Sequence, residues 1–445
     1  MRNIAAVIVL GAVCALATGC GGGGKSSTAT TAGGPTGAGQ TLHIMGFGTG
    51  DVVASSRTKL ATKAIAPAKV DNPSGGFNDQ QFLTRIASGN PPDIVYLDRQ
   101  KVGQYAAKGA LQPVDVCGID LSGFRKPAVD DVTYDGKPYG VPEFYSTRTV
   151  LIDRRVLKDA GLQKLDVADW PKLKAEAKKL AVVSGGKVRR IGFDPKIDAF
   201  LPLWAKANGA DLVSADGKTA QLDDPKVVEA LRYAVSLVNE QGGWNAFKAF
   251  RDTWDFFGGG NEFVKDQVGA FPMEDWYFST LATSSGKKID LGVQPFTDRQ
   301  GNPISWETGN AWAIPKGAKH VKLACEWART MTEKSTWLAA AKADIAFDRK
   351  SDAPFIGLFT ANVAADDAIH ALWKPTGTQF DRAAKLLWQM QDKAFSIPVS
   401  PASAEVQTAY TSAVTRALEG QQSPKAALEQ AQKEAQRAID SAEAG

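Results

Sequence analysis

The feature that most constrains the fold of this chain is the alternation of short apolar runs with longer helix-forming segments. Residues 94–97 read IVYL between turn-forming residues, as expected of a strand buried on both faces. Residues 78–88, just before them, are expected to form a helix. Asn78 can cap its first turn, and Phe82 and Ile86 lie on one face. This order predicts an α/β fold in which helices cover mostly parallel sheets.

The same alternation continues to about residue 316. Helices are expected after the Asp-Trp-Pro at 169–171 and the Asp-Pro at 224–225, because each places a capping residue before a proline. Brief strand candidates lie between helices at 269–271, 291–293 and 311–314. Beyond residue 316 the pattern becomes almost purely helical, which predicts a helical C-terminal part.

The N-terminus has the order of a secretory signal peptide. Positive charge comes first, residues 4–17 are almost wholly apolar, and small residues precede Cys20. The apolar run is shorter than the roughly 20 residues that a membrane-spanning helix needs. The segment 17–20 resembles the lipobox of bacterial lipoproteins, although Ala17 stands where leucine is usual. That resemblance implies a signal peptide over 1–19, lipidation of Cys20 and a lipid-anchored flexible linker over 20–40.

A phosphate-loop pattern overlaps this region. Residues 19–26 read GCGGGGKS, which satisfies G-x-x-x-x-G-K-[ST]. A working loop of this kind needs a strand before it and a helix after it, because the helix N-terminus binds the phosphate. Here a signal-like run precedes the loop, and a stretch rich in Ser, Thr, Gly and Pro follows it. We therefore interpret the glycines as linker, not as a nucleotide site.

Composition and reactive side chains exclude several classes of function. The net charge of +4 is spread along the chain, so no basic stripe suggests nucleic acid. The three histidines, at 43, 320 and 370, lack metal-site spacing, and no G-x-S-x-G motif occurs. We expect no cofactor, no metal and no catalysis. Cys117 and Cys325 either form a disulfide or remain two buried thiols, and the sequence leaves both open.

Several segments resemble, in the family's order, the maltose-type extracellular solute-binding proteins (family 1) of bacterial ABC sugar importers. The similar segments are IASGNPPDIV at 86–95, PYGVP at 138–142, KDAGL at 158–162, ANGA at 207–210, GAFPM at 269–273, residues 309–314 and residues 420–428. Two places depart from the family: Ile152-Asp153 stands where Tyr-Asn is common, and the second strand, near 69–70, is short.

The resemblance implies a two-lobe periplasmic-binding-protein fold of type II, with each lobe a mostly parallel sheet flanked by helices. Ligand is held in the cleft, and the lobes close over it. Chain crossings are expected near Arg148, Pro295 and Phe347. They assign residues 41–148 and 297–347 to an N-terminal lobe, and residues 149–296 and 348–445 to a C-terminal lobe.

The chemistry of sugar binding selects candidate site residues. A pyranose has an apolar face and a rim of hydroxyls, so it is bound by an aromatic plate together with hydrogen-bonding side chains. Such groups stand here at strand-end loops, where open α/β sheets bind ligands. The candidates are Asp98, Tyr145, Asp275, Trp276, Trp306, Gly309 and Asn310. Trp276 also matches a ligand-binding aromatic of the family. The structural alternatives are helix capping by Asp98, core packing of Tyr145, Trp276 and Trp306, and a simple turn at Gly309-Asn310.

The sequence therefore predicts a sugar-binding component of an ABC importer. We expect a monomer, lipid-anchored on the extracytoplasmic face of the membrane, that delivers a sugar or oligosaccharide to the permease subunits. The lack of an arginine cluster favours a neutral sugar over a strong anion. The alternatives are a binder of another polar solute, such as a polyol or phosphodiester, and a secreted carbohydrate hydrolase.

Overall fold

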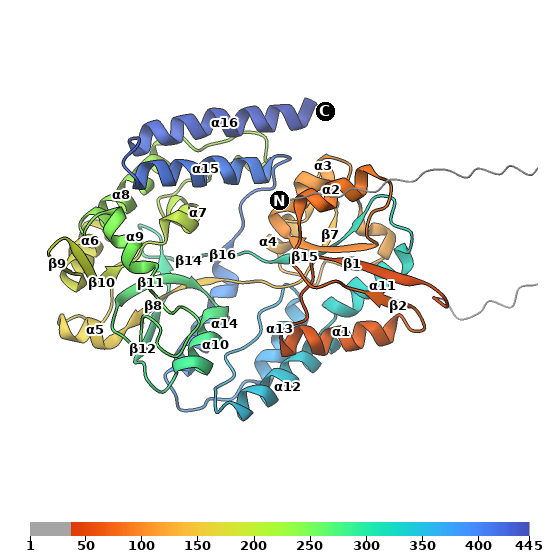
Figure 1. Ribbon diagram of the computed structural model, residues 1–445, viewed down its shortest axis with the longest axis horizontal. Coiled ribbons are helices and arrows are strands. Elements are labelled where there is room, and N and C mark those ends of the chain that lie inside the picture. Colours follow the sequence, from red (N-terminus) through yellow and green to blue (C-terminus); the bar gives the residue numbers. More distant parts are fainter. Residues whose placement is uncertain (1–36, 445) are drawn as a thin grey trace, which may run out of the picture. The chain divides into compact units, whose positions relative to one another are not determined.

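The computed structural model describes residues 37–444, whose elements form two lobes around separate sheets (Figure 1). The expected signal peptide, the lipidated Cys20 and most of the expected linker lie outside the described residues. The first lobe comprises β1 (Thr41–Met45), α1 (Val52–Ala64), β2 (Lys69–Asp71), α2 (Asp79–Ala87), β3 (Ile94–Asp98), η1 (Arg99–Lys101), α3 (Val102–Ala107), β4 (Leu111–Gln112), η2 (Val114–Cys117), α4 (Lys126–Asp130), β5 (Thr133–Tyr134), β6 (Lys137–Pro138), β7 (Gly140–Pro142), β15 (Asn310–Pro315), α11 (Val321–Thr332), α12 (Lys334–Lys350) and α13 (Val363–Leu372).

The second lobe contains the middle and the end of the chain. It comprises β8 (Arg148–Asp153), α5 (Arg154–Asp159), α6 (Trp170–Leu180), β9 (Val182–Ser184), β10 (Lys187–Phe193), α7 (Ile197–Ala207), α8 (Pro225–Asn239), α9 (Trp244–Arg251), β11 (Val268–Glu274), α10 (Trp276–Ser285), β12 (Leu291–Gln294), β13 (Phe296–Thr297), β14 (Pro303–Trp306), α14 (Phe380–Met390), η3 (Gln391–Lys393), β16 (Ala394–Phe395), α15 (Ser403–Leu418) and α16 (Pro424–Ala444). The last two helices pair with each other, as Figure 1 shows in blue.

Helix caps predicted from the sequence are present. The Asn78 side chain accepts a hydrogen bond from the backbone N–H of Gln81 at 2.8 Å, and Asp169 caps α6 in the same way. Asp224 caps α8, in which Pro225 is the first residue. These caps satisfy N–H groups that have no partner within the helix, which explains why the helices begin at these residues.

The two largest sheets are mixed and have more antiparallel than parallel pairs, so the expectation of mostly parallel sheets was wrong. The first sheet has the order β2-β1-β3-β15-β4, with β7 also paired to β15. Only the pairs that β1 makes with β2 and β3 are parallel, whereas β15 is antiparallel to all its neighbours. The second sheet has the order β12-β8-β11-β10-β9, with one parallel pair, β10 and β11.

The antiparallel strands arise because two strands enter their sheets from the other lobe. β15 begins at Asn310, which pairs with Asp98 at the end of β3. In the second sheet β8 begins at Arg148, which pairs with Glu274 at the end of β11. Each entering strand therefore starts where a neighbouring strand ends, and this brings all four strand ends to the junction between the lobes.

The packing of several segments differs from the expected lobe boundaries. Phe296 and Trp306 belong to the core of the second lobe, so the second crossing follows Trp306, not Pro295. Ala365 and Ile369 of α13 pack with Trp337 of α12 in the first lobe. The third crossing therefore follows α13, not Phe347. The first crossing leads into β8, which begins at Arg148 and belongs to the second sheet.

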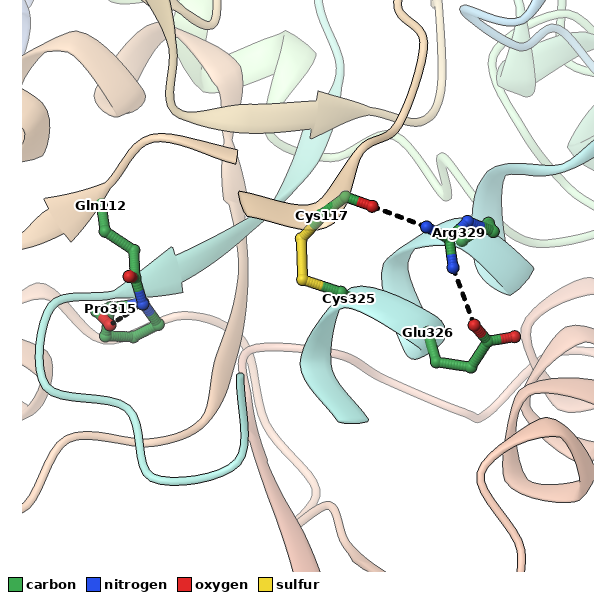
Figure 2. Close-up of a disulfide and its surroundings, with 6 residues drawn as sticks. All are labelled: Gln112, Cys117, Pro315, Cys325, Glu326 and Arg329. Atoms are coloured by element: carbon green, nitrogen blue, oxygen red, sulfur yellow. Dashed lines mark hydrogen bonds and ion pairs between the residues drawn. A yellow bond between two sulfur atoms is a disulfide. The ribbon is translucent and has the colours of Figure 1, made fainter. Parts of the chain in front are cut away.

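A disulfide joins Cys117 at the end of η2 to Cys325 in α11, 208 positions apart in sequence (Figure 2). This outcome decides between the two states that the sequence left open. Arg329 of α11 also donates a hydrogen bond to the Cys117 carbonyl at 2.6 Å and pairs with Glu326 at 2.8 Å. Bridge and hydrogen bond together connect the two separate chain segments of the first lobe.

Removing this disulfide is expected to lower stability. In the variant Cys117→Ser/Cys325→Ser the unfolded chain regains the freedom of a 208-residue separation, and such bridges typically contribute about 2–4 kcal/mol. Urea unfolding followed by tryptophan fluorescence should show a lower midpoint for the variant and for reduced wild type. Equal midpoints for oxidised, reduced and variant protein would contradict this role of the bridge.

Candidate functional site

A cavity of about 350 Å³ opens at the junction where the strand ends meet. Its lining comes from both lobes and from two crossing segments: Asp98, Phe144, Ser146, Glu274, Asp275, Trp276, Thr308, Gly309 and Asn310. Five of these residues were candidates from the sequence: Asp98, Asp275, Trp276, Gly309 and Asn310. The volume is within the range of small-molecule sites.

Two segments that cross between the lobes, residues 143–147 and 307–309, form the floor of this cavity and are hydrogen-bonded to each other. The Ser146 N–H donates to the Thr308 carbonyl at 2.8 Å, and the Thr308 N–H donates to the Ser146 carbonyl at 3.1 Å. Gly309 allows a similarly close approach, since a Cβ there would lie 2.1 Å from the Phe144 carbonyl oxygen. Any side chain at position 309 would therefore push the crossing segments apart.

Tyr145 and Trp306 do not line the cavity. Tyr145 is only 1% exposed, and its ring lies between the guanidinium groups of Arg99 and Arg125. Its neighbours Phe144 and Ser146 face the cavity, and in extended backbone successive side chains point to opposite sides. Trp306 is 4% exposed in the core of the second lobe. Both residues are therefore packed in the protein interior. Their positions do not support the prediction that they contact the ligand directly.

Four lining residues were missed as candidates: Phe144, Ser146, Glu274 and Thr308. Ser146 and Thr308 could have been selected only if it were known which side of each crossing segment faces the cavity. Glu274 directly precedes the candidate pair Asp275-Trp276, so its position at the end of a predicted strand was the available signal.

Trp276 is the aromatic plate of the cavity. It begins α10 directly after the loop that follows β11, and 43% of its surface is exposed, which is unusual for a tryptophan. The ring stacks on Phe257, with centroids 6.1 Å apart and planes at 16°. An exposed, supported indole beside a cavity can bind the apolar face of a ring-shaped ligand.

Asp275 places a carboxyl group with a shifted pKa in the same wall. It is 6% exposed, and its Oδ1 accepts hydrogen bonds from Ser146 Oγ at 2.5 Å and from the Trp276 N–H at 2.9 Å. Burial raises the pKa of Asp275 to about 7, although the Ser146 hydrogen bond opposes that shift. This carboxyl therefore keeps its proton to a higher pH than an exposed aspartate does.

The buried Arg148 side chain binds two of the residues that line the cavity. Its guanidinium pairs with Glu274 at 2.9 Å and donates to the Trp306 carbonyl at 2.7 Å and to Thr308 Oγ1 at 3.1 Å. The same group lies 4.3 Å from the centre of the Trp306 ring. Trp306 therefore packs beneath the lining residues and affects the site by holding the Arg148 side chain in place.

Buried ion pairs hold the crossing segments against the first lobe. Arg99 pairs with Glu307 and lies 3.5 Å from Asp131. Arg57 of α1 pairs with Glu143 at 2.5 Å, and both side chains are buried. Burial raises the pKa of Glu143 and of Glu307, while the neighbouring guanidinium groups oppose the shift. Each crossing segment is thus fixed by a charged side chain one residue away from the cavity lining.

Comparison with known proteins decides the family. The model of bacterial extracellular solute-binding proteins matches residues 73–347, which is more than half of the chain. This chain is a bacterial extracellular solute-binding protein. Members of this family work outside the cytoplasm, and they are binding proteins. Within residues 37–444 of this solute-binding protein, no helix has the length and hydropathy needed to cross a membrane, and no cluster of side chains is suited to a metal ion.

Individual relatives are distant. The diacetylchitobiose binding protein DasA of Streptomyces coelicolor is 26% identical over 349 residues, 73% of this solute-binding protein and 76% of the relative. A Brucella abortus relative, known only as a binding protein, is 26% identical over 172 residues, and the match spans 36% of this chain and 40% of the relative. The solved structure of CpMnBP1 with mannotriose bound has a TM-score of 0.73 and 23% identity, and covers 89% of this chain and 100% of that one. These likenesses confirm the two-lobe type II fold.

Replacing Asp275 by asparagine should change how stability depends on pH. The folded pKa of about 7 exceeds the unfolded value of roughly 3.9. The folded state therefore binds the extra proton, and wild type loses stability as the pH rises through this window. Melting temperatures should show Asp275→Asn gaining on wild type between pH 4.5 and pH 8. Asp367→Asn, at an exposed position, should show no such gain, and equal behaviour of both variants would refute the shifted pKa.

Proposed function

We propose that this protein captures a sugar or short oligosaccharide in the cavity and delivers it to the membrane subunits of an ABC importer. The observation that carries the proposal is the exposed Trp276 beside polar side chains that can accept and donate hydrogen bonds. Asp98, Asp275 and Asn310 offer such groups from three different strand ends. An apolar plate with a polar rim is complementary to a pyranose ring.

The relatives support the same class of ligand. DasA is described as binding diacetylchitobiose, a Bacillus subtilis relative as binding arabinooligosaccharides, and CpMnBP1 was solved with mannotriose. Three different oligosaccharides among distant relatives favour a carbohydrate in general. The individual sugar is set by the residues of this chain, whose identity to each of these proteins is low.

Lobe closure is the proposed means of capture. A ligand shifts two lobes toward a closed state only through contacts that the open state lacks. Asp98 and Asn310 belong to the first lobe, whereas Asp275 and Trp276 belong to the second. A sugar that touches both groups would favour closure, and the closed form would be the one that the permease recognises.

The alternative ligands and the hydrolase fit less well. No Lys, Arg or His lines the described cavity, which disfavours a phosphodiester. A linear polyol lacks the flat apolar face that Trp276 would cover. A glycosidase needs two carboxyls about 5–9.5 Å apart across the bond it cleaves. Glu274 and Asp275 are sequence neighbours, and Glu274 is already paired with Arg148.

Substituting the aromatic plate should weaken sugar binding without unfolding the protein. A thermal-shift screen of mono- and oligosaccharides, polyols, phosphodiesters and amino acids should first find a stabilising sugar, since a ligand at a hundredfold excess over Kd adds about 2.7 kcal/mol. Trp276→Ala should then bind that sugar at least about fivefold more weakly, corresponding to roughly 1 kcal/mol of lost stacking. Trp306→Ala should instead lower the melting temperature of the ligand-free protein, because Trp306 is buried. A Trp276→Ala protein that melts lower and binds normally would contradict the site.

We also propose that Cys20 carries the lipid that keeps the protein at the membrane. The proposal rests on the apolar N-terminal run that ends just before this cysteine. Mass analysis of membrane-extracted protein should find an N-terminal Cys20 bearing a diacylglycerol group. Cys20→Ser should release the protein into the medium, and a variant still anchored to the membrane would contradict the proposal.

A further inference from the structure

More carboxyl groups than guanidinium groups lie around the cavity. Three carboxyl groups line it, those of Asp98, Glu274 and Asp275, and two more, those of Asp131 and Glu307, lie against Arg99. The guanidinium groups close to this set are those of Arg99 and Arg148. Arg99 is taken by Glu307 and Asp131, and Arg148 by Glu274. The carboxyls therefore outnumber the nearby guanidinium groups.

Asp98 and Asp275 are the two carboxyls without a partner cation. Within residues 37–444, neither is within 4.0 Å of a Lys, Arg or His nitrogen. Lys101, which lies near Asp98, pairs with Asp79 at 2.9 Å. Both aspartates line the same cavity from opposite lobes. A cationic group of a ligand in the cavity would therefore meet two carboxyls that no cation of the protein pairs with.

The free oxygen of each aspartate points to the same conclusion. Asp275 is 94% removed from solvent, and both of its hydrogen bonds go to Oδ1, which leaves Oδ2 without a partner among the described residues. Asp98 uses Oδ1 to accept from the Gln100 N–H at 3.1 Å. Both carboxyls line the cavity, and neither Oδ2 accepts a hydrogen bond from a described residue. For the buried Asp275 in particular, an unpaired carboxylate is costly until it receives a charged or hydrogen-bonding partner.

Ligand hydroxyls and ligand amines satisfy such oxygens differently. A hydroxyl donates a hydrogen bond but leaves the negative charge in place. An ammonium group donates hydrogen bonds and cancels the charge, and charge-assisted hydrogen bonds are roughly twice as strong as neutral ones. Burial raises the pKa of both Asp98 and Asp275, which is the response of carboxyls that lack such a cation.

We infer that the preferred ligand is a sugar that bears a protonated amine, with the ammonium group bound by Asp275 and Asp98 and the sugar ring on Trp276. This inference rests on the proposed sugar-binding function and narrows its substrate class from sugars in general to basic amino sugars. It differs from the neutral sugar expected from the sequence, an expectation that took no account of which carboxyls lack a partner cation.

Matched sugars that differ only in the amine provide the test. Titration calorimetry at pH 7.0 and low salt should compare glucosamine with N-acetylglucosamine and glucose, and chitobiose with diacetylchitobiose. Acetylation removes the positive charge while the ring stays the same. The amine form is expected to bind at least tenfold more tightly than its acetylated partner, and added salt should reduce that ratio because screening weakens the attraction.

Variants assign the preference to the aspartates. Asp275→Asn should remove most of the tenfold ratio, because the amide keeps the size and hydrogen-bonding capacity of the side chain but loses its charge. Asp367→Asn, exposed in α13, should leave the ratio unchanged. Circular dichroism would check that both variants are folded.

The outcomes separate the two proposals. If the acetylated or neutral sugars bind as tightly as the amines, the inference fails while the sugar-binding function survives. If neither member of any pair binds, and the wider sugar screen also gives no stabilisation, the proposed function fails and this inference fails with it. A preference that persists in Asp275→Asn would also overturn the assignment of the ammonium to Asp275.

Discussion

The buried ion pairs beneath the cavity are the interaction on which the site depends. Arg57 with Glu143, and Arg99 with Glu307, each join a crossing segment to the first lobe. Removing such charges from water is expensive, and the pairs offset this cost only while their geometry is kept. Glu143 and Glu307 directly precede the lining residues Phe144 and Thr308. The pairs therefore specify where the floor of the cavity lies, whatever their net contribution to stability.

The positions of the lining residues follow from how the strands enter the sheets. Asp98 and Glu274 end their strands, while Asn310 and Arg148 begin the antiparallel strands beside them. A chain that leaves one lobe and enters the sheet of the other must begin its new strand at the junction. Polar residues at these four strand ends are therefore brought together without any one segment containing the site.

Much of this arrangement could be predicted from local sequence, and the remainder could not for a physical reason. Caps such as Asn78, and strand ends such as Asp98 and Asn310, are marked by nearby residues and were identified. The faces of Tyr145 and Trp306 depend on packing against Arg99, Arg125 and Arg148, which come from other segments. The direction of a strand and the positions of the second and third crossings depend on which lobe each strand or helix packs against. Amphipathic periodicity shows only that an element has a buried face, and does not identify the lobe that buries it. The ion pairs of Arg99 with Glu307 and of Arg148 with Glu274 could not be predicted for the same reason, since their partners come from distant segments.

The connection between the crossing segments would limit the lobe closure that we propose. The two hydrogen bonds between Ser146 and Thr308 hold these segments side by side, and Gly309 lets the second segment contact the Phe144 carbonyl. A rotation that kept these contacts would move Trp276 and Asp275 toward Asp98 and Asn310 as one unit. The carboxyls of Asp98 and Asp275 would then approach each other, and two like charges would resist this approach. A ligand that cancels the charge would remove that resistance, so in the proposed mechanism the same two side chains would couple ligand charge to lobe closure.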